Sequence, residues 1–286
     1  MAVLAPSGYK PVISMVVLGI SALIIGSLVD PIAGLMPLFG MLCLMLAVFF
    51  AYFWRDPDRP IPRQDGVLVS PADGHAMFLV RERAIGRRPS TQERETGTIE
   101  HDELTGDWYP EPLAQPLSFE TEQRFEAVPL GEECSTDVWR IAIFMSPLDV
   151  HVNRAPESGV IERLEHRTGK GLHRGPFMAA YKKESEFNER VRSVYLLDNG
   201  ERIEMTQISG ALARTIIPYL LDGTTVKRGQ RIGMIQLGSR VDIRVPAERY
   251  TSTIITAADN HAEHPKGMMV QAGATILFEP LKEGSE

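Results

Sequence analysis

The chain has 286 residues, is 44% hydrophobic and carries a formal net charge of −7. This length suffices for one large domain or two small ones with a sizeable apolar core. The acidic balance supplies no basic field, so nucleic acid is not expected as a partner. Cys43 lies in an apolar segment and Cys134 in a polar one, which argues against a disulfide framework or a cysteine-rich metal site.

Two uncharged segments, 11–29 and 32–54, come first along the chain. Each has about the 20 helical residues that cross a bilayer core. Asp30-Pro31 between them is a natural helix stop and turn. We therefore expect residues 1–54 to form a transmembrane helical hairpin. The alternative is a cleaved signal peptide followed by a buried helix, but the cleavage-site pattern is poor and a second apolar run follows.

Positive charges flank this hairpin. Lys10 precedes the first segment, and Arg55, Arg59 and Arg63 follow the second. Because positive residues favour the cytoplasmic side, both ends are expected to face the cytoplasm. The chain is thus expected in the cell (inner) membrane, with the domain after the hairpin on the cytoplasmic side.

The rest of the chain has three parts. Residues 55–64 are rich in proline and charge and are expected to be a juxtamembrane linker. Residues 65–286 contain mostly short β-prone runs, two of them joined by Asn199-Gly200, a strong hairpin signal. Residues 84–136 within this domain are polar, without clear periodicity, and are expected to be an extended insertion. The best helical pattern covers 176–191.

Two polar motifs and a histidine pair stand out in the second part. The sequence SPADG at 70–74 is typical of a turn in which Asp73 accepts hydrogen bonds from backbone amides. Period-two alternation in SPLDVHVNRAP predicts a strand with Asp149, His151 and Asn153 on one face. The alternative for this face is simple solvation. His261 and His264 lie in a polar stretch that predicts a loop, so no metal site is expected.

The stretch GMIQLGSRVDIRV, residues 233–245, alternates like a strand but contains Gly238-Ser239. One interpretation is a bulged strand with glycine for geometry. A hydrolase nucleophile is a second, although G-x-S-x-G is absent. In a third, the Ser239 hydroxyl attacks the unhindered carbonyl of Gly238 in an N→O acyl shift.

The chain resembles the short bacterial and archaeal form of the phosphatidylserine decarboxylase family. The resemblance runs through most of the chain outside the insertion. It rests on six stretches, in order FWRDPDRP, SPADG, MSPLDVHVNRAP, GPFMAAYKKESEFNER, GQRIGMIQLGSRVDIRVP and VQAGATILF. The expected fold is α+β: a two-helix transmembrane hairpin before a mostly β catalytic domain, with a barrel-sandwich or hammerhead-like C-terminal part.

The resemblance implies a self-processing, pyruvoyl-dependent enzyme. Ser239 attacks the Gly238 carbonyl, and β-elimination then separates a β chain, 1–238, from an α chain, 239–286. Hydrolysis leaves a pyruvoyl group at position 239, the only cofactor expected. Its ketone forms a Schiff base with the serine amine of phosphatidylserine and accepts electrons as CO₂ leaves, which yields phosphatidylethanolamine.

The resemblance also implies roles for the acid–base residues. His151 is expected to be the proton donor in decarboxylation and a candidate self-cleavage base, with Asp73 orienting it and His75 in reserve. In the long forms of the family the motif is D-x-H-x-x-H, but here Arg154 occupies the second histidine position. Arginine is always protonated and cannot act as a base. It could instead bind the lipid phosphate or the substrate carboxylate.

Other functions remain open at this point. The alternatives are a pyruvoyl enzyme acting on another serine-headed lipid or on a soluble amino acid, a membrane-tethered hammerhead module without activity, and a serine hydrolase. The hairpin favours a substrate in the lipid bilayer. The partners expected are therefore a membrane phospholipid and the bilayer, the α and β chains of one precursor, and a second copy in a dimer.

Overall fold

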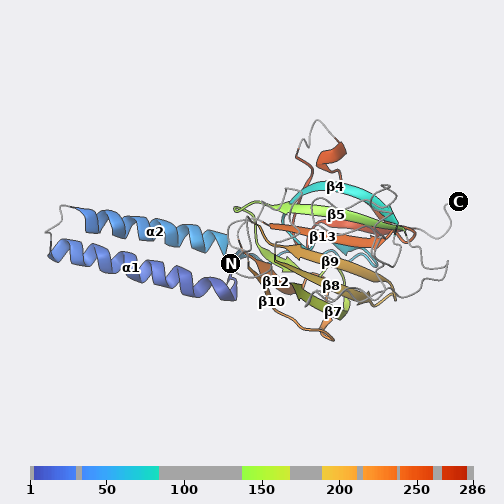
Figure 1. The fold of residues 1–286 in the computed structure, drawn as a ribbon, viewed down its shortest axis with the longest axis horizontal. Coiled ribbons are helices and arrows are strands. Elements are labelled where there is room, and N and C mark those ends of the chain that lie inside the picture. The colour runs from blue at the N-terminus through green and yellow to red at the C-terminus, as the bar shows by residue number, and fades with distance from the viewer. Residues whose placement is uncertain are drawn as a thin grey trace, which may run out of the picture.

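The computed structural model describes residues 3–29, 34–83, 137–167, 189–210, 215–236, 239–259 and 266–281. Two antiparallel helices project from one end of a β-rich body (Figure 1). They are α1, Tyr9–Leu28, and α2, Leu35–Phe53, close to the expected limits. Both are long and apolar enough to cross a membrane by length and composition. The predicted turn at 30–31 and the insertion at 84–136 lie outside the described residues.

Small residues allow the two helices to pack closely. Gly19, Ala22 and Gly26 of α1 are buried, as are Gly40 and Cys43 of α2. A Cβ added at Gly40 would lie 2.8 Å from the carbonyl oxygen of Gly19. Large side chains such as Leu28 and Met45 point outward instead. This distribution is typical of helices that pair through small residues in an apolar surrounding.

The body is built around one eight-stranded antiparallel sheet with the order β11-β7-β8-β9-β13-β5-β4-β15. Its strands are β4 Gly74–Arg83, β5 Asp137–Met145, β7 Gly159–Arg167, β8 Arg190–Leu197, β9 Arg202–Ile208, β11 Thr225–Val226, β13 Ser239–Pro246 and β15 Met269–Val270. The α+β class, mostly β after the hairpin, is thus confirmed. The strand β13 lies near the centre of this sheet, between β9 and β5.

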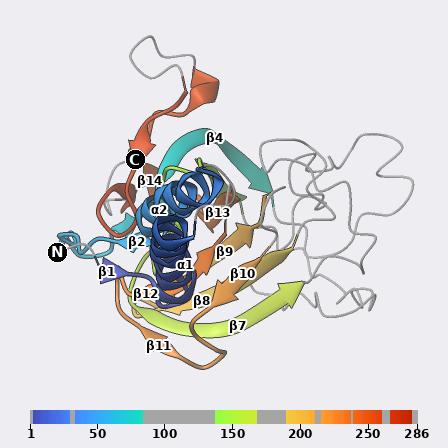
Figure 2. The ribbon, with the colours of Figure 1, turned by 90° about the vertical axis from the view of Figure 1, so that its left-hand side faces the viewer.

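Three smaller sheets complete the body. They contain β10 Ile216–Pro218, β12 Arg231–Ile235 and β6 Val152–Arg154 in one; β14 Tyr250–Ser252, β16 Ile276–Pro280 and β3 Leu68–Val69 in another; and β1 Val3–Leu4 with β2 Arg55–Asp56 in the last. Short 3₁₀ helices cover Pro6–Gly8 and Ala257–Asp259. Figure 2 shows the body from the end at which the hairpin joins it, looking along the two helices.

Alternation along β13 separates two environments. Val241, Ile243 and Val245 point into the main apolar core with residues of β5 such as Ile141 and Ile143. The residues between them form buried ion pairs: Arg240 and Arg140 both donate to Asp242, and Arg244 donates to Glu204. The central strand is therefore fixed by apolar packing on one face and by charge pairing on the other.

The hairpin signal at Asn199-Gly200 is confirmed, because these residues form the turn between β8 and β9. The helical pattern predicted over 176–191 falls largely on residues outside the described ranges. Its last part is wrong, since Arg190 already begins β8. Residues 261 and 264, expected in a loop, also lie outside the described residues.

Candidate active site

The chain passes from one sheet to another around Gly238-Ser239. The strand β12 ends at Ile235 in the three-stranded sheet, whereas β13 begins at Ser239 in the eight-stranded sheet. Leu237 and Gly238 themselves lie outside the described residues. The interpretation as a bulge within one continuous strand is therefore wrong. The interruption falls where the chain must leave one sheet and enter the next.

Ser239 is fully buried at the start of β13, opposite Met145, the last residue of β5. Its hydroxyl donates to the Met145 sulfur, with Oγ and Sδ 3.3 Å apart. A thioether is a weak acceptor. The hydroxyl is thus held out of water without a strong acceptor at this contact.

His151 lies in the loop that follows β5, not in a strand. The predicted strand over 149–153 is wrong in its start, because β6 begins only at Val152. The expectation of a solvated face also fails: His151 and Asn153 are both 0% exposed, and Asp149 is 8% exposed. The Asp149 carboxylate accepts from the backbone N–H of Ser146 at 2.7 Å, which closes a turn that pulls this segment inward.

The surroundings of His151 determine its protonation. Its Nδ1 lies 2.8 Å from the carbonyl oxygen of Asp149. A carbonyl only accepts, so Nδ1 carries the hydrogen and Nε2 is the basic nitrogen of the neutral ring. Burial lowers the pKa of His151 to about 4, against the smaller opposing effect of that hydrogen bond. His151 is therefore neutral at pH 7 and able to accept a proton.

Asn153 connects the site's segments. Its side-chain nitrogen lies 3.8 Å from the Met145 sulfur, the same atom that Ser239 contacts, and 3.3 Å from the carbonyl oxygen of Pro71. Its side-chain oxygen accepts from Gln207 of β9 at 2.8 Å. In addition, the Ile235 N–H donates to the carbonyl of His151 at 3.1 Å. The two ends of the 235–239 crossing are thus tied to the His151 segment.

Asp73 is buried in the SPADG loop, as a turn residue that accepts from a backbone amide. That amide is Ala272 N, at 2.8 Å from Oδ1. Its carboxylate also forms a two-pronged pair with Arg59, with Nη2 and Oδ2 2.7 Å apart. Asp73 influences His151 through its charge, raising the pKa slightly against the dominant effect of burial. The following Gly74 has φ 140°, and a Cβ there would lie 2.0 Å from the Phe144 carbonyl.

His75, the reserve candidate, lies on β4 rather than in the loop. It is half-buried, and its Nδ1 lies 3.3 Å from the carbonyl oxygen of Gly267. Its register partners are Phe144 and Met269. Among the contacts of the described residues, those of His75 do not reach the Ser239, Met145 and Asn153 group.

Arg154 is buried and its guanidinium contacts protein groups. Nη2 donates to Asp56 and to the Pro57 carbonyl, both at 3.0 Å, and Nη1 donates to the Gly229 carbonyl at 3.1 Å. Asp56 also pairs with Arg231. These contacts make Arg154 a clamp between the segment after the hairpin and the body, and they offer little to a phosphate or carboxylate.

Replacing Arg154 by alanine is expected to lower the free energy of unfolding by about 3 kcal/mol, because it leaves a buried carboxylate without one of its cations. The KM of the folded fraction for the lipid substrate should stay near the wild-type value. Thermal unfolding in detergent and steady-state kinetics measure the two effects. Arg202→Ala, which breaks an exposed pair with Glu162, is the matched control. A stable Arg154→Ala protein with a greatly raised KM would instead support the substrate-binding role.

Three residues that contact the predicted site residues were not themselves predicted from the sequence. Met145 appears above only within MSPLDVHVNRAP, Arg59 as a charge after the hairpin, and Phe53 within the second apolar segment. Each acts across a long sequence separation, Arg59 on Asp73, Met145 on Ser239, and Phe53 on His151, whose ring centroid is 4.4 Å away. The signal in the sequence is that all three residues lie in stretches that resemble the family, Phe53 and Arg59 in FWRDPDRP and Met145 in MSPLDVHVNRAP.

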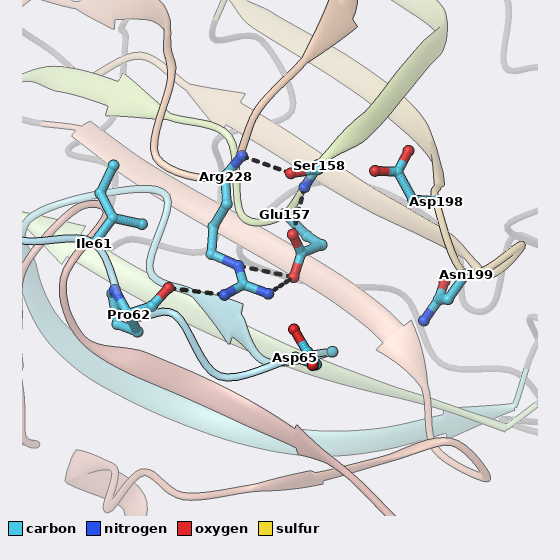
Figure 3. A pocket seen from close by; sticks show the side chains of 9 residues that line it. Ile61, Pro62, Asp65, Glu157, Ser158, Asp198, Asn199 and Arg228 are labelled. Atoms are coloured by element: carbon cyan, nitrogen blue, oxygen red, sulfur yellow. Dashed lines mark hydrogen bonds and ion pairs between the residues drawn. The ribbon is translucent and has the colours of Figure 1, made fainter.

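A separate surface hollow of about 380 Å³ does not involve these residues (Figure 3). It is lined by Ile61, Pro62, Asp65, Gly66, Glu157, Ser158, Asp198, Asn199 and Arg228. Arg228 spans it, donating to Glu157 and to the Pro62 carbonyl, both at 2.8 Å. Its charged centre is thus paired internally. Within the described parts of the chain, no group of three or more His, Cys, Asp or Glu residues could hold a metal ion.

The site fits an enzyme with a sequestered serine better than a binding module. A module gains nothing from burying a hydroxyl against a thioether and a neutral imidazole in a neighbouring segment. The apolar hairpin adjoining that segment further points to a substrate met at an apolar surface.

Comparison with known proteins identifies the family. The phosphatidylserine decarboxylase family model matches residues 46–277. The phosphatidylserine decarboxylase proenzyme of Azorhizobium caulinodans is 33% identical over 84% of this chain and 77% of its own length. A Methanopyrus kandleri protein, provisionally named archaetidylserine decarboxylase proenzyme, is 33% identical over 84% of this chain and 86% of its own length. The chain belongs to the phosphatidylserine decarboxylase family.

A Streptomyces griseus phosphatidylserine decarboxylase proenzyme is more similar over a shorter region. It is 54% identical over 107 residues, which are 37% of this chain and 46% of the relative. The match thus spans less than half of that relative's length. No solved structure matches the chain.

Proposed function

We propose that the protein is a self-processing decarboxylase that converts phosphatidylserine to phosphatidylethanolamine and CO₂. The observation that carries the proposal is the burial of Ser239 at the crossing between two sheets, where Ile235 of the preceding strand is hydrogen-bonded to the segment that holds the buried, neutral His151. The names of the relatives, proenzymes of serine-lipid decarboxylases, agree with it.

Self-processing uses atoms of the chain itself. His151 Nε2 takes the proton of Ser239 Oγ, and the oxygen attacks the Gly238 carbonyl carbon. The peptide C–N bond breaks as the ester forms, and the proton passes to the released amine. Loss of the Ser239 α-proton then breaks the Cβ–Oγ bond, freeing the carboxylate of Gly238 and leaving dehydroalanine. Water converts this residue to a pyruvoyl group and ammonia.

The site suits that group, because position 239 is buried and its former hydroxyl contacts only the weak acceptor Met145 among the contacts of the described residues. When present, the pyruvoyl ketone would bind the serine amine and accept the electron pair as CO₂ leaves. The chain's own contribution is to exclude water and to hold a proton donor. His151, after accepting a proton, serves as the donor to the former α-carbon, and Asp73 with Arg59 fixes the adjoining loop.

Anchorage in the membrane is part of the proposal. The hairpin joins the body at one end (Figures 1 and 2), and its last residue, Phe53, contacts His151, so the bilayer surface and the site would adjoin. The Arg55 guanidinium lies 3.8 Å from the centre of the Tyr52 ring, and Trp54 lies between these two residues in the sequence. Such aromatic residues are expected at a membrane interface. Positive residues at this end favour the cytoplasmic face of the inner membrane. We further propose a dimer, and a barrel-sandwich or hammerhead-like arrangement of the C-terminal strands.

A serine-headed lipid with a different backbone is the second candidate substrate. It is favoured by the identity to the Methanopyrus kandleri relative, which extends over most of both chains. The chemistry at the head group would be the same, because the reacting amine and carboxylate are unchanged.

Intact-protein mass spectrometry of the purified protein tests this proposal. We expect two chains, 1–238 and 239–286, the smaller blocked to Edman degradation and reactive toward carbonyl reagents. Cyanoborohydride trapping should then attach phosphatidylserine, or archaetidylserine for the second candidate, to the smaller chain, and free serine far less. Trapping of free serine as efficiently as lipid would point to a soluble amino acid. An uncut chain with full activity would exclude the pyruvoyl mechanism.

A further inference from the structure

The base of the hairpin touches the segment that carries His151 at three places. The Phe53 and His151 rings are in tilted contact, with centroids 4.4 Å apart and planes inclined by 42°. Arg55 donates to the Leu148 carbonyl at 2.7 Å. Asp56 accepts from Arg154 at 3.0 Å. Residues 53–56 thus contact residues 148–154 at three points, so that the end of the apolar hairpin and the segment that carries His151 are joined.

The contact at Phe53 is enclosed. Phe53 is 1% exposed although it ends a helix whose side chains mostly point outward. It belongs to a small apolar cluster, separate from the main core, with Ala5, Val150, Val152 and Met234. Val150 and Val152 flank His151, and Ala5 is held to the hairpin base by its N–H bond to the Trp54 carbonyl at 2.8 Å. The His151 ring therefore contacts Phe53 of the hairpin base, and the two residues that flank His151 pack in the same apolar cluster as Phe53.

From this geometry we propose that Phe53 is a positioning residue for His151, so that the apolar hairpin completes the active site as well as tethering it. The inference rests on the proposed function. The Phe53 ring excludes water from one side of the imidazole and leaves the Nδ1–H directed at the Asp149 carbonyl. The hairpin therefore controls both the orientation and the protonation of the base.

Charged groups from three segments act on His151. Asp149 on its own loop and Asp73 raise the pKa of the imidazole, whereas Arg55 at the hairpin base lowers it; all three effects are smaller than that of burial. Tyr219, packed on the same cluster, stays neutral because burial raises its pKa to about 12. Removing the Phe53 ring admits water and so weakens the effect of burial, which is the largest cause of the lowered pKa. The pKa of His151 should then rise from about 4 toward 6.5.

The test is the rate of self-cleavage of Phe53→Ala, measured from pH 5 to 8 during cell-free synthesis into lipid nanodiscs. At pH 7.5 we expect a rate about 10-fold to 100-fold below wild type, from loss of ring orientation. At pH 5 the rate should fall further, by up to roughly 30-fold if the pKa returns to its ordinary value, because only the neutral ring accepts a proton. Wild type should show little change between these two pH values.

Two variants make the result specific. Phe49→Ala removes the same ring from the exposed side of α2 and should cleave like wild type. Phe53→Leu still excludes water and should restore the wild-type pH profile and part of the rate. A Phe53→Ala protein that inserts and cleaves like Phe49→Ala would overturn the inference while leaving the proposed function intact. Absence of cleavage in wild type would instead refute the proposed function. If Phe53→Ala fails to fold, Phe53→Leu decides the question: cleavage at the full wild-type rate with the wild-type pH profile counts against the inference.

Discussion

Ser239→Ala is expected to give a single uncut chain of 31.8 kDa without decarboxylase activity. Alanine has no hydroxyl to attack the preceding carbonyl and no β-oxygen to eliminate, so the pyruvoyl group cannot form. The loss of activity should be about 10³-fold or more, since the nucleophile and the cofactor disappear together. Denaturing gels and lipid product analysis measure both effects.

Ser252→Ala is a suitable control, because Ser252 lies on β14 in a different sheet. It should be cut and active. Partial activity in an uncut Ser239→Ala protein would contradict self-processing. An uncut wild type whose activity still requires Ser239 would favour the serine hydrolase.

His151→Asn is expected to slow self-cleavage by about 10²-fold to 10⁴-fold, the range typical of a lost general base. The amide can still donate to the Asp149 carbonyl, but it has no basic nitrogen. In wild type the cleavage rate should be nearly constant from pH 8 to 5. It should fall only near pH 4, because a base whose pKa is lowered stays neutral until the pH drops to that value. Timed sampling of precursor and products provides the measurement.

His75→Asn distinguishes the two histidines. If His151 is the base, the His75→Asn precursor, in which His151 is intact, should still be cut at a rate close to that of wild type. If cleavage is lost in His75→Asn and retained in His151→Asn, the roles must be exchanged. The half-buried position of His75 on β4 makes that second outcome the unexpected one.

The sequence predicts elements that depend on local pattern well. The two apolar helices and the β8–β9 turn occur where uncharged runs and Asn199-Gly200 indicate them. It fails where tertiary contacts override that pattern. Polar residues at 149–153 suggested an exposed strand face, yet the Ser146–Asp149 turn and the hairpin base bury His151. The pairing of Arg59 with Asp73 could not be predicted from composition, since a charged residue after an apolar segment usually remains solvated.

The crossing at Gly238-Ser239 shows the same limit in another form. Alternation continues on both sides of it, so a single sequence window cannot reveal that β12 and β13 belong to different sheets. Sheet membership depends on partners far along the chain, β6 and β10 for one strand and β5 and β9 for the other. The chemistry of Ser239 could be inferred from motifs, whereas its burial against Met145 required the fold.

The central position of β13 in the sheet has a consequence for refolding after the chain is cut. After a cut behind residue 238, β13 of the smaller chain still pairs with β5 and β9 of the larger chain. In the same way β15 pairs with β4, and β16 pairs with β3. The nicked protein should hold together without a covalent link. Once unfolded, however, its two chains must find each other by diffusion, whereas the precursor folds as one molecule. Maturation would thus be a one-way step: recovery from denaturation becomes dependent on concentration, and each molecule assembles efficiently only once.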